Sequence, residues 1–307
     1  MARPAIVPFS EEHVEAAAAL LAERHERHRS AFPELPAPAD YGAEIAALLA
    51  AGATGACTDG AYVLGRSIST EHWGPNVWVE SAGYATRDPE LLRDVRAEAA
   101  TGWFEQGLKE HYAFVPATDP ALIDTWFRLG FGGQHANALM TVPEREWPSG
   151  VREATEDDVE ALVELGPLLS RHQQRSPCFS QLPEQTLDEI RGEVLDDFKD
   201  DKVVNLVYEV DGRIVSNFAL CPVELSAAHS GLACPPGATL IAFAVTAPEA
   251  QGTGAGVALT DASFAWARTH GYETIAVDWR VTNLGASRFW PNRGFRTSFL
   301  RLYRSLP

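Results

Sequence analysis

The strongest constraint on the fold is a pattern that occurs twice, about half a chain apart. Ser10 precedes acidic residues and an apolar helical pattern, and Thr155 precedes a closely similar run. A serine or threonine in front of acidic residues is typical of a helix N-terminus, because its side chain caps unpaired backbone N–H groups. The chain has 307 residues, so one such copy in each half predicts two domains of similar fold.

Two further pairs of features support the repeat. Asp59-Gly60 and Asp211-Gly212 each lie between two runs of β-forming residues, which is typical of hairpin turns. Late in each half, a helical pattern stops at Gly130-Phe131 and at Gly294-Phe295. A glycine at this position closes a helix because it adopts the left-handed conformation without strain.

The boundaries follow from these repeats and from composition. The segment 142–150 contains two prolines and two glutamates, which is typical of a joint between domains. We therefore expect one domain over residues 1–143 and a second over residues 150–307. In the second copy the alternation of patterns predicts a mixed α/β fold with one helix between two parallel strands. The expected strands are 150–154, 202–210, 213–224, 239–246, 273–280 and 296–305, and the expected helices are 156–170, 184–199, 254–270 and 284–291, with an irregular stretch over 171–183.

Charge and hydropathy exclude several classes of partner. The chain carries 25 basic and 42 acidic residues, a net charge of −17, so binding to nucleic acid through phosphate attraction is not expected. No segment reaches the roughly 18 to 20 apolar residues that span a bilayer, so no membrane association is expected. The four cysteines form no Cys-x-x-Cys pair and predict reduced thiols in a cytoplasmic protein. The sequence leaves the oligomeric state open.

A glycine-rich loop is the sharpest chemical signal. The apolar strand expected at 239–246 leads to Gly252, Gly254 and Gly256, which open a helix. Glycines allow backbone N–H groups to approach a ligand, and the helix N-terminus adds partial positive charge, so this arrangement is typical of a phosphate site. The loop lacks the lysine of a Walker motif, and its glycine spacing differs from the dinucleotide fingerprint.

Two blocks together resemble the Gcn5-related N-acetyltransferase (GNAT) superfamily. The first is the loop itself, and the second follows the strand expected at 273–280. In this sequence they read Gln251-x-x-Gly254-x-Gly256 and Asn283-x-x-Ala286-x-x-Phe289-Trp290-x-x-x-Gly294-Phe295. The resemblance implies two tandem GNAT-like acyl-CoA N-acyltransferase domains, and it covers residues 150–307 clearly.

The resemblance also implies the cosubstrate and its contacts. Acetyl-CoA would lie between strands 239–246 and 273–280, with its pantetheine arm along the first strand and its pyrophosphate on the glycine loop. The residues expected to contact it are Ala244, Val245, Thr246, Gln251, Gly252, Thr253, Gly254, Ala255, Gly256, Val257, Asn283, Ser287 and Trp290. The implied reaction is direct transfer of acetyl to a primary amine, without an acyl-enzyme and without a metal.

The expected catalytic residues are Asp278 and Tyr303. Asp278 interrupts an apolar strand, where some members of the family carry a glutamate base. It either takes the amine proton, or it faces solvent or pairs with an arginine such as Arg280 or Arg301. Trp290 occupies the position of the tyrosine that protonates the leaving thiolate in many members, and an indole N–H cannot do so. Either Trp290 only packs and water or backbone assists the thiolate, or Tyr303 or Tyr272 replaces the acid.

The acceptor is expected to be a small-molecule amine, on the evidence of the acidic composition. His172 and Phe179 lie in the region that borders the acceptor site in the family. The acidic segment 184–201 either attracts a cationic amine or is a solvated helix face. His25-x-x-His28 has metal-ligand spacing but no third ligand, and we interpret it as a solvated helix end. A non-catalytic CoA-binding or regulatory protein of the same fold is the alternative function.

The first copy lacks the cofactor loop. Its counterpart of strand 239–246 is expected at Asn76–Tyr84, and no Gln-x-x-Gly-x-Gly sequence follows it. Asp88 and Glu90 follow instead, and their carboxylates would repel a pyrophosphate. We therefore expect the first copy to be a degenerate GNAT-like domain that binds no acetyl-CoA and packs against the second.

Overall fold

The chain forms a mixed α/β structure with two compact units. The computed structural model describes residues 5–70, 74–180, 184–226 and 229–307. Unit 1 comprises Met1–Ala136, Ser230–Cys234 and Thr297–Pro307, and unit 2 comprises Asn137–His229 and Pro235–Arg296. The fold class predicted from the sequence is thus confirmed.

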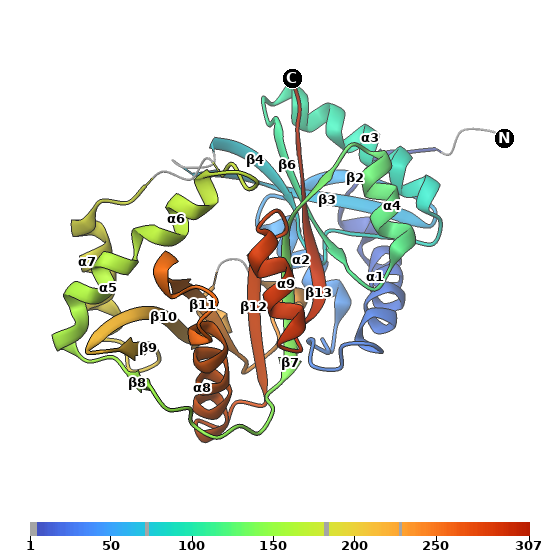
Figure 1. The fold of residues 1–307 in the computed structure, drawn as a ribbon. Coiled ribbons are helices and arrows are strands. Elements are labelled where there is room, and N and C mark those ends of the chain that lie inside the picture. Colours follow the sequence, from blue (N-terminus) through green and yellow to red (C-terminus); the bar gives the residue numbers. More distant parts are fainter. Residues whose placement is uncertain (1–4, 71–73, 181–183, 227–228) are drawn as a thin grey trace. The chain divides into compact units, whose positions relative to one another are not determined.

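Unit 1 is a mixed sheet with helices packed against it (Figure 1). Its strand order is β1-β2-β3-β4-β6-β13, and β5 pairs with β3. Only β4 and β6 pair in parallel, and the other described pairs are antiparallel. The strands are β1 Val7–Pro8, β2 Thr54–Thr58, β3 Ala61–Thr70, β4 Gly74–Val79, β5 Tyr84–Thr86, β6 Glu110–Pro116 and β13 Arg296–Ser305, and the helices are α1 Val14–Arg29, α2 Tyr41–Ala50, α3 Pro89–Glu105 and α4 Pro120–Arg128.

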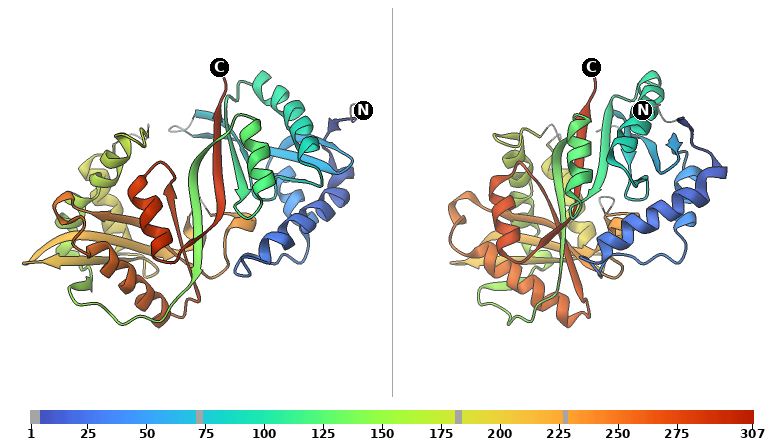
Figure 2. Two further views of the ribbon diagram at one scale, coloured as in Figure 1. Left: turned by 45° about the vertical axis from the view of Figure 1, so that its right-hand side comes forward. Right: turned by 90° about the vertical axis from the view of Figure 1, so that its right-hand side faces the viewer.

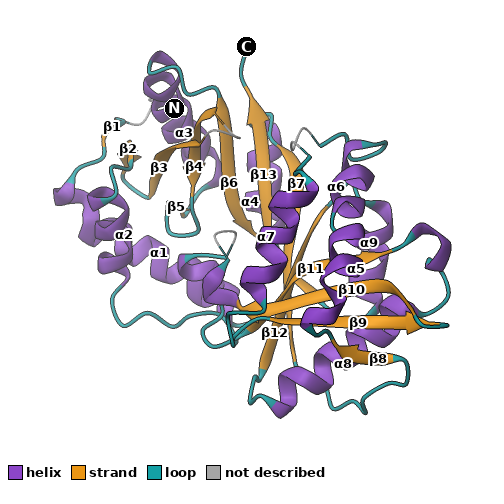
Figure 3. Cartoon of the chain, turned by 90° about the vertical axis from the view of Figure 1, so that its left-hand side faces the viewer, coloured by secondary structure: helices purple, strands orange, loops and turns teal. Residues whose placement is uncertain are grey.

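Unit 2 repeats this plan with the order β7-β12-β11-β10-β9-β8. The strands β11 and β12 are parallel, whereas β8, β9, β10 and β11 pair antiparallel in succession. Helices α5 and α7 cover one face of β9 and β10 (Figure 3). The strands are β7 Gly132–Thr141, β8 Val151–Glu153, β9 Val204–Val210, β10 Arg213–Pro222, β11 Thr239–Thr246 and β12 Thr274–Arg280, and the helices are α5 Val159–Leu165, α6 Pro167–Gln174, α7 Leu187–Asp197, α8 Ala255–Thr269 and α9 Leu284–Asn292.

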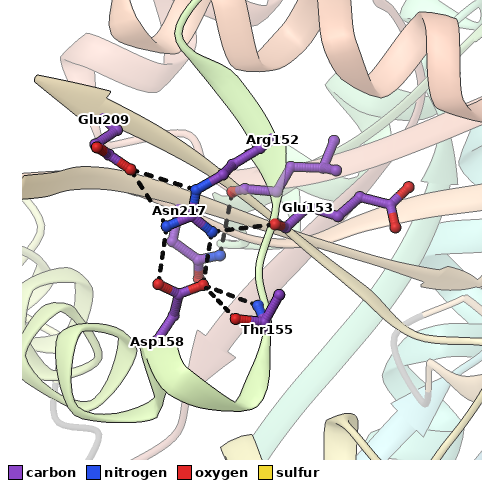
Figure 4. A network of polar contacts seen from close by, with 7 residues as sticks. Arg152, Glu153, Thr155, Asp158, Glu209 and Asn217 are labelled. Carbon is purple, nitrogen blue, oxygen red and sulfur yellow. Dashed lines mark hydrogen bonds and ion pairs between the residues drawn. The ribbon is translucent and has the colours of Figure 1, made fainter. Parts of the chain in front are cut away.

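The two helix openings predicted from the repeat have the same geometry. Ser10 and Thr155 each begin a single 3-10 turn with a capping box, in which the third residue, His13 or Asp158, accepts a hydrogen bond from the cap's backbone N–H. In unit 2 Arg152 extends this cap (Figure 4), because its Nη1 lies 2.6 Å from Asp158 Oδ2. The same guanidinium contacts Glu209, which ties the start of α5 to β9.

The other repeated features are confirmed as well. Both Asp-Gly pairs join antiparallel strands, β2 to β3 and β9 to β10. Gly130 and Gly294 have φ values of 84° and 99° and follow α4 and α9, in the left-handed position that closes a helix.

The last strand of each copy pairs in a way that the sequence did not predict. The strand expected at 296–305 is β13, but it pairs antiparallel with β6 of unit 1, from Phe299 opposite Pro116 to Ser305 opposite Glu110. Figure 2 shows this red strand beside the teal β6. Strand β7, which follows the first copy in the chain, lies next to β12 in unit 2. A period-2 pattern identifies a strand but does not identify its neighbour.

Three local predictions are wrong. The strand expected at Asn76–Tyr84 ends at Val79, and β5 turns back to pair with β3. The helix expected at 156–170 is instead a 3-10 turn followed by α5 and α6, and α6 begins at Pro167 and extends to Gln174 into the stretch expected to be irregular. Residues 181–183 of that stretch lie outside the described residues. None of the described helices is long and apolar enough to cross a bilayer.

Candidate functional site

The parallel strands of unit 2 separate and form a fork. The pairing of β11 with β12 joins Thr239 to Ile275 and ends at Ile241 opposite Val277, although both strands continue. Ala242 is the residue at which the pairing of β11 with β10 slips, because Ile241 faces Leu220 and Phe243 already faces Ala219. Such a bulge bends a strand and often lies next to an active site. Beyond Ala242, β11 therefore presents an edge that β12 does not pair with.

The register shows which backbone groups point into the fork. The N–H of Ala247 donates to Val215 O at 2.8 Å, which fixes the phase of the β10–β11 ladder. Val245 then directs its backbone groups to β10, whereas Ala244 and Thr246 direct theirs towards β12. Gln251 Nε2 donates to Thr246 O at 3.4 Å and holds the loop against the strand end. Of the three strand residues expected to hold the pantetheine arm, two thus have suitably directed backbone groups.

The glycine loop ends in a helix that has no side-chain cap. Gly252 and Gly254 have φ values of 79° and 99°, and Gly254 is the N-cap of α8. The first bond within the helix runs from Ala258 N–H to Gly254 O at 2.9 Å. The N–H groups of residues 255–257 therefore have no acceptor within the helix. Residues 251–254 and Val257 are exposed, whereas Ala255 is buried. The loop in front of these donors therefore lies at the surface, at the positive end of the helix dipole, where an anion can bind.

The corresponding helix of unit 1 is closed to an anion. Asp88 is the N-cap of α3, and its carboxylate accepts a hydrogen bond from Glu90 N–H at 2.9 Å. Pro89 removes one further backbone donor. Glu90 adds a second carboxylate in the first turn. The Asp88 carboxylate therefore caps the start of α3, whereas no side chain caps α8. The charge of Glu90 is balanced by ion pairs with Arg93 and Arg128.

Asp278 lies at the branch point of the fork. It follows Val277, the last residue of β12 that pairs with β11, and it is half-buried. Because side chains alternate along a strand, Asp278 lies on the same face as Arg280. Arg280 Nε donates to Gln173 Oε1 of α6 at 3.2 Å, so this face of β12 lies towards α6.

Two of the expected cofactor residues have structural hydrogen bonds at the start of α9. Asn283 is the N-cap of this helix, and its Oδ1 accepts from Ala286 N–H at 3.1 Å. Ser287 Oγ donates to Val281 O at 2.9 Å. Both bonds fix the turn between β12 and α9, and contact of either side chain with a cofactor stays a prediction.

The tyrosine and tryptophan positions differ in their surroundings. Trp290 is buried and packs against Phe295 and Phe218. Tyr303 lies on β13 in unit 1, donates a hydrogen bond to Glu110 and packs on Tyr112. Burial, followed by the Glu110 hydrogen bond, raises the pKa of Tyr303 to about 12. Tyr303 therefore lies in unit 1, whereas Asp278 lies in unit 2.

The two residues expected to contact the acceptor lie close in sequence and are both exposed. His172 is on α6, one residue before Gln173. Phe179 follows that helix, is 69% exposed and has a φ of 46°. Their contact with an acceptor stays a prediction. His25 and His28 are buried, so their interpretation as a solvated helix end is wrong: they point into the core of unit 1.

A pocket of about 440 Å³ in unit 2 reaches the bulge. It lies among α5, α7, β9, β10 and β11, and its lining includes Ala242 and Phe243. Polar side chains also line the pocket, and among them Asn205 Nδ2 donates to Asp197 Oδ2 at 3.1 Å. The sequence contained a signal for it, since Asn205 and Asn217 interrupt apolar strands beside an acidic helix, but no spacing connected them.

Comparisons with known proteins agree with this fold. Residues 169–295 match the acetyltransferase (GNAT) family. The chain is similar in structure to a GCN5-related N-acetyltransferase from Sphaerobacter thermophilus, with 14% identity and a TM-score of 0.60 over 98% of this chain and 95% of that one. It is also similar to a GCN5-related glucosamine N-acetyltransferase region of a fungal multi-domain GH3 β-N-acetylglucosaminidase.

For that second protein the identity is 12% and the TM-score 0.58, over 99% of this chain and 38% of the fungal one, so the chain spans well under half of its length. At these identities both likenesses show the fold alone, and they show it for nearly the whole chain. No curated protein matches the chain significantly in sequence.

Proposed function

Because residues 169–295 match the acetyltransferase (GNAT) family, we propose that unit 2 binds acetyl-CoA in the fork between β11 and β12 and transfers the acetyl group to a small primary amine. The observation that carries the proposal is the combination of an unpaired edge on β11 with the uncapped start of α8. The edge offers strand-like hydrogen bonds to the pantetheine amides, and the helix start offers N–H donors to the pyrophosphate.

The residues fit this ligand position by position. Backbone groups of Ala244 and Thr246 would pair with the pantetheine arm. Glycines at 252 and 254 adopt positive φ and so bring the backbone close to the phosphates. At Gly256 an added Cβ would be in van der Waals contact with the Phe289 ring, at 3.4 Å, so the first turn of α8 lies close to α9.

Asp278 is the proposed base. An ordinary alkylamine is about 0.1% neutral near physiological pH, which corresponds to roughly 4 kcal/mol of barrier, so a group that takes the proton accelerates attack. The ammonium group gives one proton to Asp278, and the neutral nitrogen bonds to the thioester carbon. The carbon–sulfur bond breaks, the second nitrogen proton leaves to water, and the thiolate takes a proton from water. Trp290 supports the fold in this scheme and transfers no proton.

Unit 1 is proposed to bind no acetyl-CoA. The Asp88 cap and Glu90 occupy the start of α3, where a pyrophosphate would need open donors. We infer that the sequence boundaries 1–143 and 150–307 describe two copies of one fold, of which the second keeps the ligand site.

Titration calorimetry with CoA and acetyl-CoA tests the proposal. We expect one site per chain in the wild type and none in Gly254→Glu. Gly271→Glu is the matched control, because Gly271 lies at the other end of the same helix, also has a positive φ, of 80°, and also has open space around an added Cβ. Two sites would contradict the assignment of unit 1, and no binding at all would overturn the proposed function.

A second candidate function is CoA binding without catalysis. It is favoured by the burial of Trp290, where many relatives have a tyrosine, and by the position of Tyr303 in unit 1. CoA release from acetyl-CoA in the presence of a panel of primary amines distinguishes the two functions. Normal CoA binding with no release above the rate without enzyme would favour the second.

A further inference from the structure

The pocket beside the fork is lined by apolar side chains of the sheet and by acidic side chains of α7. Ala219, Ala242 and Phe243 come from β10 and β11, and Glu193 and Asp197 come from α7. No lysine, arginine or histidine is among the described lining residues. The lining therefore has a negative charge on one side only.

Two buried asparagine side chains hold the Asp197 carboxylate in place. Asn217 Nδ2 donates to Asn205 Oδ1 at 3.1 Å, and Asn205 Nδ2 donates to Asp197 Oδ2 at 3.1 Å. Asn205 and Asn217 are both more than nine-tenths buried. Asn217 Nδ2 also donates to Leu206 O at 3.3 Å, so the pair is anchored to β9 and holds one oxygen of the carboxylate at the pocket wall.

Asp197 has no cationic partner among the residues that the structure describes, and the charged neighbours that act on it, Asp196 and Asp200, are acidic. Burial raises its pKa, and Asp200 and Asp196 raise it further, against the Asn205 hydrogen bond. The same field acts on Cys221 in the pocket wall, whose pKa is raised to about 11 by burial and then by Asp197, Asp200 and Glu224. A partly buried carboxylate without a counter-ion is costly, and a cationic ligand group would remove that cost.

The sheet sets the distance between the carboxylate and the fork. Asn205 on β9 lies opposite Ala219 on β10, and Ala219 lies opposite Phe243 on β11. Two strand spacings separate β9 from β11, which is roughly 10 Å. A molecule that reacts at the fork can thus reach Asp197 only with a group several bonds away from its reacting nitrogen.

From these observations, and resting on the proposed function, we propose that the acceptor is a small dication, whose reacting amine lies at Ala242 and whose second positive charge is bound by Asp197. The Asn217–Asn205 pair positions this carboxylate, and Glu193 of α7 lines the same pocket. The segment 184–201, for which the sequence left two interpretations open, then binds substrate through α7.

Calorimetry on the full chain, with and without saturating CoA, tests this with three probes of equal carbon-chain length. Putrescine is a dication, butylamine is a monocation, and γ-aminobutyrate has a carboxylate in place of the second amine. We expect putrescine to bind about tenfold to a hundredfold more tightly than either of the others, as one charged hydrogen bond predicts.

Asp197→Asn is expected to abolish this preference, because it keeps the shape and an acceptor for Asn205 but removes the charge. Asp196→Asn is the control, since Asp196 is the neighbouring acid, is exposed and pairs with Lys199 outside the pocket. Equal binding of the three probes, binding of none of them, or a preference that survives Asp197→Asn would overturn the proposal. Loss of CoA binding alone would contradict the proposed function and leave the pocket assignment intact, because amine binding is also measured without CoA.

Discussion

The ring of Trp290 stands edge-on to the ring of Phe295, with centroids 5.5 Å apart and an interplanar angle of 85°. Unit 1 contains the same pair, since Trp126 meets Phe131 at 4.9 Å and 83°. In both units the tryptophan is on the helix that ends at the Gly-Phe turn, and both tryptophans are buried. This shared packing explains Trp290 without any part in proton transfer.

Trp290→Phe and Trp126→Phe are therefore expected to have the same kind of effect. Each removes ring volume from a packed core and should lower the free energy of unfolding by about 1–3 kcal/mol. Urea unfolding measures this loss, and kcat for acetyl transfer below the transition should be unchanged in both. A tenfold fall in kcat confined to Trp290→Phe would show that the indole takes part in the reaction.

Asp278→Asn should reduce acetyl transfer strongly. An amide cannot take the amine proton, so we expect kcat/KM to fall by about 10²- to 10⁴-fold. CoA affinity should stay within twofold, because the pyrophosphate donors lie on α8. Steady-state kinetics and calorimetry on the same preparation separate the two effects.

The control for this variant is Glu273→Gln, an exposed acid just before the other, paired end of β12. It should leave both quantities unchanged. If Asp278→Asn retained full activity, the amine would enter the site already neutral and Asp278 would serve another purpose.

Much of the fold could be predicted because local signals decide it. The Asp-Gly hairpins, the capped helix starts and the closing glycines each depend on a few neighbouring residues, and all of them are confirmed. The position of β13 next to β6 depends instead on which strand edges are open once the sheets form. The residues 296–305 themselves do not indicate which strand β13 pairs with.

The candidate site divides in the same way. The loop at 251–257 is a contiguous motif, so its place at the start of α8 was predictable. The pocket is assembled from three strands and two helices, and Asn205, Asn217 and Asp197 come together only through the β9–β10 register. A single sequence shows such residues as unusual polar positions but does not show that they meet.

Tyr303→Phe should affect stability and leave catalysis unchanged. Its hydroxyl donates to Glu110 within unit 1, so loss of this bond should cost about 1–2 kcal/mol. We expect a lower Tm and an unchanged kcat at 25 °C. A large loss of kcat with normal CoA binding would instead identify Tyr303 as the acid that protonates the thiolate.

Three buried histidines should make unit 1 sensitive to acid. Burial lowers the pKa of His25 to about 4, of His28 to about 3 and of His111 to about 4. For His111 the Arg96 guanidinium lowers the pKa further, because its Nη2 lies 2.5 Å from Nδ1. All three rings are therefore neutral in the folded chain near pH 7.

The free energy of unfolding should fall as the pH falls, because protonation is linked to unfolding. In the unfolded chain these rings take up protons near pH 6.5, whereas in the folded chain they do so only near pH 3 to 4. The unfolded state thus binds more protons over this window, and stability is retained above pH 6.5 and lost as the pH falls towards 4. Each histidine contributes about 1.4 kcal/mol per pH unit inside the window, so the three together should lower the free energy of unfolding by several kcal/mol at pH 5.

Urea unfolding at pH 7.5 and pH 5 measures this difference in stability. His28→Phe should reduce the difference by about a third, and a phenylalanine suits the site because the His28 ring already packs edge-on to Phe32 and Phe299. The exposed His172 provides the control, because His172→Gln should leave the pH dependence unchanged; equal stability of the wild type at both pH values would contradict the burial of neutral rings.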